Sequence, residues 1–177
     1  SQGLLLMIPN MYKIAGEMLP CVFDVSARTV ATQSLNIFGD HSDVYACRQT
    51  GFAMLCETNP QEVMDLSPVA HLATIEGKVP FINFFDGFRT SHEIQKIEKW
   101  DYADLKEMCN MDSVAAFRAH ALNPEHPAMR GSHENGDVFF QHREACNTAY
   151  NELPAIVEKY MAKINEKLGT NYGLFNY

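Results

Sequence analysis

Three short apolar runs predict the strands of a sheet. They are residues 21–25, 43–47 and 79–85, and Asp86-Gly87 ends the third run with a turn signal. In each run the apolar residues are nearly continuous instead of alternating strictly with polar ones. Runs of this kind are typical of parallel strands that are buried on both faces. We therefore expect an α/β fold, with a mostly parallel sheet and helices on both of its faces.

A helix is predicted between the last two of these runs. Asn59 offers a side-chain cap, and Pro60 suits the first helical position because an N–H there would have no helical partner. Gly77 is expected to end the helix. A strand, a helix and a second strand in this order form the unit from which parallel sheets are built.

Other periodic segments predict further helices. Two short helices are expected before the first strand, with Pro9 interrupting the chain between them. The C-terminal portion, from about residue 101 to residue 168, is expected to be helical apart from a polar surface loop over residues 123–136. Apolar side chains recur at helical spacing over residues 153–168. We expect this stripe to be buried in the core.

Composition excludes several classes of partner. The chain has 177 residues, which suits one domain, and its net charge is −8 from 14 basic and 22 acidic residues. Nucleic acids and anionic membrane surfaces need clustered Lys and Arg, so neither is an expected partner. The apolar run at residues 4–8 is far shorter than the about 20 residues that span a bilayer. No basic segment precedes it, so no signal peptide is expected.

The five cysteines are widely separated and include no Cys-x-x-Cys pair. This spacing predicts neither a zinc ribbon nor a ferredoxin-type cluster. We interpret them as buried structural thiols of a protein in a reducing cytoplasm. The chain starts without Met and ends on the apolar residues 172–177, so we expect it to be a piece of a longer polypeptide.

Three polar segments after the apolar runs are candidates for a ligand site: residues 25–29, 48–51 and 86–93. Ligands of open parallel sheets bind beyond the carboxyl ends of the strands. Each segment has an arginine and a hydroxyl residue, and an arginine presents a planar fork that suits a carboxylate or a phosphate. The arginines are Arg28, Arg48 and Arg89, and Thr29 follows the first. The alternative for each arginine is an ion pair with a nearby acid that fixes the loop.

The polar motif Asp40-His41-Ser42-Asp43 has two alternative interpretations. His41 and an aspartate are suited to acid–base chemistry or to metal binding. Alternatively, the Asp and Ser side chains accept backbone N–H groups in a turn. The other histidines lack zinc-site spacing, so we expect no metal centre, and no phosphate-binding or nucleophile-elbow motif is present. These patterns indicate an α/β domain with anion-binding loops, without specifying a reaction.

Six longer segments carry a family resemblance: residues 1–13, 26–28, 38–43, 48–52, 84–94 and 121–127. In this order they resemble pyruvate:ferredoxin (flavodoxin) oxidoreductases, and the likeness covers essentially the whole chain. The resemblance implies that residues 1–177 are a single partial domain, the later part of the first domain of a multidomain chain. In the family that domain holds the pyrimidine end of thiamine diphosphate, and its fold is that of thiamine pyrimidine-binding domains.

The resemblance also implies a reaction for the parent protein. It oxidatively decarboxylates pyruvate with coenzyme A to acetyl-CoA and carbon dioxide, in an anaerobic type of metabolism. The implied cofactors are thiamine diphosphate, Mg²⁺ and three 4Fe-4S clusters, and the implied acceptor is ferredoxin or flavodoxin. The enzyme is expected to be a cytoplasmic homodimer. The alternatives are another 2-oxoacid:ferredoxin oxidoreductase and a non-catalytic structural domain, and a thiamine-activating glutamate upstream would favour an enzyme.

Arg28 matches the family's pyruvate-binding arginine, so the resemblance implies that it contacts the substrate carboxylate. The activating glutamate and a threonine that contacts pyruvate have no match and are expected upstream of Ser1. Asp24 stands where a histidine is common in the family, and it would share a face with Arg28 if the strand continued. Further candidates for the cleft are Thr29, His41, Arg48 and Arg89. Because the glutamate and the clusters are missing, the isolated chain is predicted to be inactive.

Overall fold

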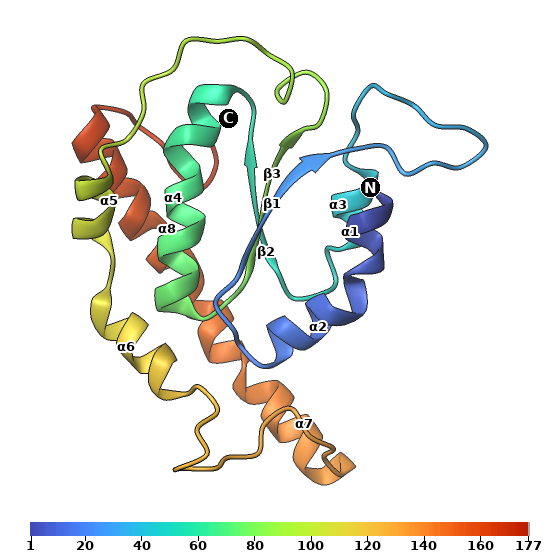
Figure 1. Ribbon diagram of the computed structural model, residues 1–177, viewed down its shortest axis with the longest axis vertical. Helices are drawn as coiled ribbons and strands as arrows, with labels where there is room; N and C mark the ends of the chain where they lie inside the picture. The colour runs from blue at the N-terminus through green and yellow to red at the C-terminus, as the bar shows by residue number, and fades with distance from the viewer. Residues whose placement is uncertain (177) are drawn as a thin grey trace.

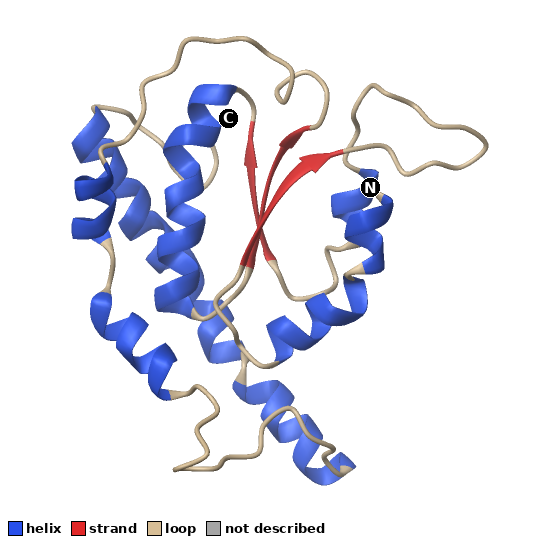
Figure 2. Ribbon diagram, viewed as in Figure 1, coloured by secondary structure: helices blue, strands red, loops and turns tan. Residues whose placement is uncertain are grey.

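A parallel sheet of three strands forms the centre of the structure, a computed structural model that describes residues 1–176. The strands are β1 (Val22–Ala27), β2 (Ala53–Glu57) and β3 (Phe81–Asp86). β3 lies between the other two and pairs in parallel with both, so the order is β1-β3-β2. All three strands therefore end at one edge of the sheet. This carboxyl edge lies at the arrowheads in Figure 2.

The prediction of a strand over residues 43–47 is wrong, because this segment is helical. It forms most of α3 (Ser42–Ala46), and the second strand of the sheet is β2 instead. The side chain of Asp43 accepts the N–H of Val44 at 2.7 Å, a local bond that favours a helix start over a strand. Val44 and Cys47 are three residues apart, share one helix face and are both buried. The apolar residues that suggested a strand therefore pack from a helical turn.

α4 (Pro60–Gly77) connects β2 to β3 over the range that the sequence predicts. The Asn59 side chain accepts the N–H groups of Gln61 and Glu62, each at 3.0 Å. At the other end the helix stops at Gly77, as predicted, and the residue after it, Lys78, is left-handed. α4 and the long helix α8 (Asn147–Leu168) cover one face of the sheet and share a core with it (Figure 1).

The N-terminal helices cover the opposite face. They are α1 (Gln2–Leu6), α2 (Ile8–Gly16) and α3, and α1 and α2 are separate, as Pro9 predicts. Successive strand residues point to opposite faces. Ala27, Ile82 and Phe84 belong to the core beneath the N-terminal helices, whereas Phe81 belongs to the core beneath α4 and α8. The predicted α/β fold, with a parallel sheet and helices on both faces, is confirmed.

The C-terminal portion is largely helical, as predicted. Before α8 it contains α5 (Tyr102–Met108), α6 (Met111–Ala119) and α7 (Gly136–Ala145). The predicted surface loop falls in the irregular stretch between α6 and α7, where the side chains are mostly exposed. α7 projects away from the sheet in Figure 1 and buries none of its residues. The apolar stripe of α8 is buried at Leu153, Val157, Tyr160, Met161 and Ile164, as predicted.

The cysteines match the expectation of buried thiols only in part. Cys47 is buried beneath the N-terminal helices, whereas Cys56 is exposed and the others are half-buried; all are free thiols. Cys56 lies on β2, an edge strand of the three-stranded sheet. None of the helices formed by the described residues is long and apolar enough to cross a bilayer.

Candidate functional site

The carboxyl edge of the sheet brings the ends of the strands side by side. In the strand register, Ala27 of β1 pairs with Asp86 of β3, and Glu57 of β2 pairs with Phe85. The segments that follow β1 and β3 both begin at this edge (Figure 1). Ligands of open α/β sheets bind in this place. Arg28, the first residue after β1, lies there as predicted.

The backbone of Arg28 is hydrogen-bonded to the start of α3. Its N–H donates to Oδ2 of Asp43 at 2.9 Å, while Oδ1 of the same carboxylate accepts the N–H of Val44. Asp43 is 0% exposed. Hydrogen bonds to an ionised acceptor are stronger than neutral ones. The buried carboxylate therefore fixes the point at which the chain leaves β1.

Gly87, the first residue after β3, lies against Arg28. A Cβ atom on Gly87 would stand 1.9 Å from the carbonyl oxygen of Ala27 and 2.6 Å from Nε of Arg28. The first of these contacts is with the backbone of β1, which cannot give way without shifting the strand. Only glycine fits here. The side chain of Arg28 therefore passes directly over the residue that follows β3.

The guanidinium of Arg28 forms no ion pair with a carboxylate of residues 1–176. Asp24, which was expected to share a face with it, instead accepts Nδ2 of Asn83 at 2.9 Å and lies 3.9 Å from Nε2 of His71. The described residues thus do not form the loop-fixing ion pair that was the alternative for Arg28. A half-buried positive fork at this edge is suited to an anionic ligand.

Thr29 belongs to the loop that joins β1 to α3. Its hydroxyl donates to the carbonyl of Phe38 at 3.0 Å, and the N–H of Val30 donates to Oγ of Ser42 at 2.9 Å. Oδ1 of Asp40 accepts both the hydroxyl and the N–H of Ser42, and these hydrogen bonds lower the pKa of Asp40. These contacts agree with the second interpretation of residues 40–43, in which the Asp and Ser side chains accept backbone N–H groups in a turn.

His41 and Arg89 lie near Asp86 at the same edge. The ring of His41 stands edge-on to that of Phe84, with 5.3 Å between the centroids. Oδ1 of Asp86 accepts the N–H groups of Phe88 and Arg89. Burial raises the pKa of Asp86, but these hydrogen bonds and the nearby charges of Arg89 and His41 lower it overall. The segment after β3 therefore turns at the predicted place.

The prediction that Arg48 lies at the ligand-binding edge is wrong. Because α3 replaces the predicted strand, residues 48–51 come before β2 and lie at the amino end of the sheet. Arg48 is exposed, and its Nη1 donates to the carbonyl of Tyr45 at 2.7 Å. Thr50 likewise donates to the carbonyl of Cys47, also at 2.7 Å. This arginine closes the end of a helix and is not part of the candidate site.

Glu57 is an ionisable residue at the end of β2 that the sequence analysis did not single out. It is 1% exposed, and neither carboxyl oxygen has a hydrogen-bond partner within residues 1–176. Burial is the main cause that raises the pKa of Glu57 to about 9. Glu57 lies two residues after Leu55 on β2, so its side chain points to the same face of the sheet, the face that α4 covers. The carboxyl group is therefore enclosed within the protein. A glutamate that ends an otherwise apolar run was the available signal.

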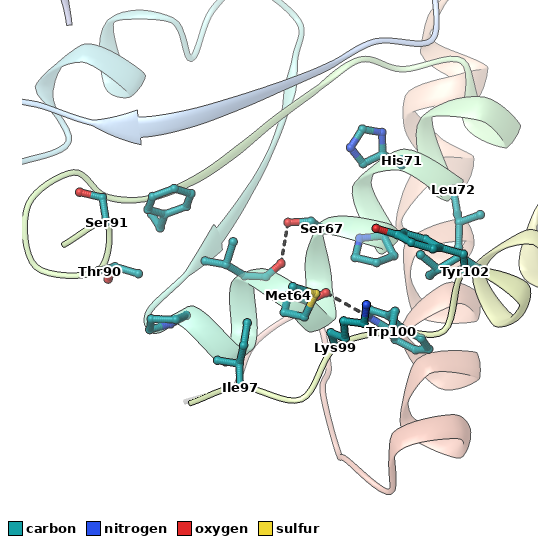
Figure 3. Close-up of a pocket in the computed structure, with 15 residues that line it drawn as sticks. Met64, Ser67, His71, Leu72, Thr90, Ser91, Ile97, Lys99, Trp100 and Tyr102 are labelled. Carbon is teal, nitrogen blue, oxygen red and sulfur yellow. Dashed lines mark hydrogen bonds between the residues drawn. The ribbon is translucent and has the colours of Figure 1, made fainter. Parts of the chain in front are cut away.

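An apolar pocket of about 660 Å³ lies between α4 and the segment that leads to α5 (Figure 3). Two of the polar groups in its wall are paired with backbone carbonyls of α4. Oγ of Ser67 donates to the carbonyl of Val63 at 2.6 Å, and Nε1 of Trp100 donates to that of Met64 at 3.0 Å. The carboxyl edge with Arg28 is the stronger candidate, because ligands of open α/β sheets bind beyond the carboxyl ends of the strands.

Comparison with known proteins identifies one family over most of the chain. The thiamine-diphosphate-binding domain of pyruvate flavodoxin/ferredoxin oxidoreductases matches residues 1–162. The pyruvate-flavodoxin oxidoreductase of Enterobacter agglomerans is 64% identical, and the pyruvate:ferredoxin oxidoreductase of Moorella thermoacetica is 59% identical. A pyruvate dehydrogenase (NADP+) of Cryptosporidium parvum is 55% identical.

These comparisons also give the size of the relatives. Each alignment includes 100% of this chain. It includes only 15% of the length of the first two relatives and 9% of the length of the third. The chain thus spans a small part of the curated relatives that it matches. On the family match and these identities, the chain belongs to the pyruvate flavodoxin/ferredoxin oxidoreductases, within their thiamine-diphosphate-binding domain.

Proposed function

We propose that this chain is the part of a pyruvate-oxidising enzyme that binds the carboxylate of pyruvate. The parent enzyme oxidatively decarboxylates pyruvate with coenzyme A to acetyl-CoA and carbon dioxide. One observation carries the proposal: Arg28 follows β1 at the carboxyl edge, its backbone is bound to Asp43, and its guanidinium has no carboxylate partner within residues 1–176. Membership of the family supports pyruvate as the ligand.

The chemistry of Arg28 suits this role. A guanidinium donates two parallel hydrogen bonds to a carboxylate, and each charge-assisted bond contributes about 1.5–3 kcal/mol. Holding the carboxylate at one place also fixes the neighbouring ketone, which lowers the entropic part of the barrier. Arg28 would therefore bind the substrate and orient its reacting carbon without taking part in proton transfer.

The described residues do not complete a site for thiamine diphosphate, the cofactor that the family description implies. When bound, this cofactor supplies an electron sink for decarboxylation. Glu57, whose carboxyl has no partner within residues 1–176, is 1% exposed. No three His, Cys, Asp or Glu side chains of residues 1–176 gather into a metal site. We assign the activating glutamate, Mg²⁺ and three 4Fe-4S clusters to other parts of the parent polypeptide.

The electron acceptor and the assembly belong to the same proposal. The names of the relatives specify flavodoxin, ferredoxin or NADP+, although their identities to this chain are all between 55% and 64%. This similarity indicates that a different part of the parent selects the acceptor. We propose ferredoxin or flavodoxin as the acceptor, and a cytoplasmic homodimer as the assembly.

Substitution of Arg28 in the parent enzyme tests the proposal. Pyruvate-dependent viologen reduction is measured with thiamine diphosphate, Mg²⁺ and coenzyme A. Arg28→Ala should lower kcat/KM for pyruvate by roughly ten- to a hundredfold, with KM for coenzyme A unchanged. Arg28→Lys keeps the charge but loses the fork, so its loss should be smaller. Normal kcat/KM for pyruvate in Arg28→Ala would exclude the proposed contact.

A further inference from the structure

The side chain of Asp43 connects α3 to the residue that follows β1. It lies in α3, yet its Oδ2 accepts the N–H of Arg28, fifteen positions earlier in the sequence, at 2.9 Å. Its Oδ1 accepts the N–H of Val44 at 2.7 Å, so both oxygens of one carboxylate are used. Asp43 is 0% exposed. Because burying a carboxylate is costly unless it is hydrogen-bonded, each of these bonds matters.

The bond to Arg28 acts where the chain leaves the sheet. β1 ends at Ala27, and Arg28 has no ladder partner beyond it. The N–H of this residue is instead held by Asp43, which fixes the direction in which the Arg28 side chain departs. A second bond of the same kind, from Val30 to Ser42 at 2.9 Å, supports the loop two residues later.

The other side of Arg28 is confined by β3. A Cβ on Gly87 would stand 2.6 Å from Nε and 2.7 Å from Cδ of Arg28, so the arginine stem lies directly on this glycine. The arginine is thus held through its backbone from α3 and through its stem by the residue after β3. These two contacts hold the backbone and the stem of Arg28, and so they determine the direction of the guanidinium.

We propose that Asp43 is a positioning residue, which aims the Arg28 guanidinium at the substrate carboxylate by holding the Arg28 backbone. This inference rests on the proposed function of Arg28. It assigns Asp43 no contact with the substrate. A misplacement of about 1 Å at a substrate-orienting group can cost up to about a hundredfold in rate. Loss of the Asp43 contact should therefore lower pyruvate turnover without removing any group that touches pyruvate.

The test uses Asp43→Asn and Asp43→Ala in the full-length parent enzyme. Asn keeps one acceptor oxygen and Ala keeps none, so kcat/KM for pyruvate should fall by about tenfold in Asn and further in Ala. KM for coenzyme A should stay unchanged in both. Asp65→Asn is the matched control, because Asp65 is also buried and its carboxylate also accepts two hydrogen bonds, in this case from the side chains of Gln61 and Tyr172. It should lower the melting temperature without changing kcat/KM for pyruvate.

A double-mutant cycle separates positioning from a general structural effect. If Asp43 acts through Arg28, then adding Asp43→Asn to Arg28→Ala should lower kcat/KM by less than twofold more. An undiminished tenfold loss in the Arg28→Ala background would overturn the inference while leaving the role of Arg28 intact. The inference also fails if the Asp43 variants lower only the melting temperature and behave as Asp65→Asn does. Normal turnover in Arg28→Ala alone would instead overturn the proposed function.

Discussion

Arg28 and Arg48 each stand beside an apolar run with a hydroxyl residue close by, yet they lie at opposite ends of the sheet. At the carboxyl edge, Asp43 accepts a hydrogen bond from the backbone N–H of Arg28. The guanidinium of Arg28 has no carboxylate partner within residues 1–176. At the amino end the guanidinium of Arg48 itself donates to a backbone carbonyl, that of Tyr45.

The other polar groups at the amino end are used in the same way. Thr50 donates to the carbonyl of Cys47, and Tyr150 of α8 donates to the carbonyl of Gly51 at 2.8 Å. These bonds satisfy the end of α3 and tie α8 to the segment before β2. Under the proposed function, the same residue types serve a ligand at one end and the fold at the other. The difference is that Arg28 follows a strand of the sheet, whereas Arg48 precedes one.

The largest expected effect is the complete inactivity of the isolated chain. The carboxyl edge supplies an arginine for a carboxylate, but no three potential metal ligands gather within the described residues, and the chain spans 15% of its first two relatives. Purified residues 1–177 with thiamine diphosphate, Mg²⁺ and coenzyme A should give no pyruvate-dependent viologen reduction. Turnover near that of a full-length relative would show that the edge needs no other part of the parent.

Two glycine substitutions should separate the two ends of the sheet. Gly87→Ala places a Cβ 1.9 Å from the Ala27 carbonyl, so it should lower the free energy of unfolding by about 1–3 kcal/mol and displace Arg28. In the parent enzyme, kcat/KM for pyruvate should fall by about a hundredfold or more. Urea unfolding of the chain and viologen reduction by the parent measure the two effects.

Gly51→Ala is the matched change at the amino end. Gly51 has φ of +94°, and its Cβ would meet Oη of Tyr150 at 2.8 Å, so a loss of about 1–3 kcal/mol in stability is expected. Because the proposed substrate contact lies at the opposite end of the sheet, kcat/KM of the folded parent should stay normal. Equal losses of kcat/KM in the two variants would mean that the ends do not differ in function.

Glu57→Gln should change how stability depends on pH. Since its folded pKa of about 9 lies above the ordinary value of 4.5, folded chains keep a proton that unfolded chains release. The contribution of this group is fully present below pH 4.5 and is lost as pH rises towards 9, with a slope of up to about 1.4 kcal/mol per pH unit. The neutral amide removes this slope, so Glu57→Gln should be the more stable protein at pH 8.

Urea unfolding at pH 5, 6.5 and 8 measures the slope for both proteins. Glu107→Gln serves as the control, because Glu107 is exposed on α5 and its replacement should leave the wild-type slope unchanged. Parallel pH profiles for wild type and Glu57→Gln would show that Glu57 is ionised in the folded protein. In that case the carboxyl edge would hold a buried charge that neither Arg28 nor Asp43 accounts for.

Local patterns predicted most of the fold. β1, α4 and β3 follow from an apolar run, an Asn-Pro helix start and a second apolar run, and each of these signals is local. β2 was missed because its residues, Ala53 to Glu57, lack the β-branched and aromatic types that mark strands and end on a charge. Residues 43–47 looked extended from composition alone, whereas the bond from Val44 to the Asp43 side chain favours a helix.

The residues of the candidate site could be located only where the strand before them had been predicted correctly. Arg28 and Arg89 were placed correctly because the strands before them were correct, and Arg48 was misplaced because β2 was missed. The support around Arg28 was not predictable, since Asp43 and Gly87 reach it from α3 and from the end of β3. Contacts between distant segments depend on strand order and register, which no local pattern contains.

The most direct test compares Arg28→Ala with Arg48→Ala in the full-length parent enzyme. Both changes remove one guanidinium, but only Arg28 lies at the carboxyl edge, so kcat/KM for pyruvate should fall roughly ten- to a hundredfold in the first and by less than twofold in the second. Melting temperatures confirm that both variants are folded. Equal kcat/KM values for the two variants, or a larger loss in Arg48→Ala, would contradict the assignment of the pyruvate site to Arg28.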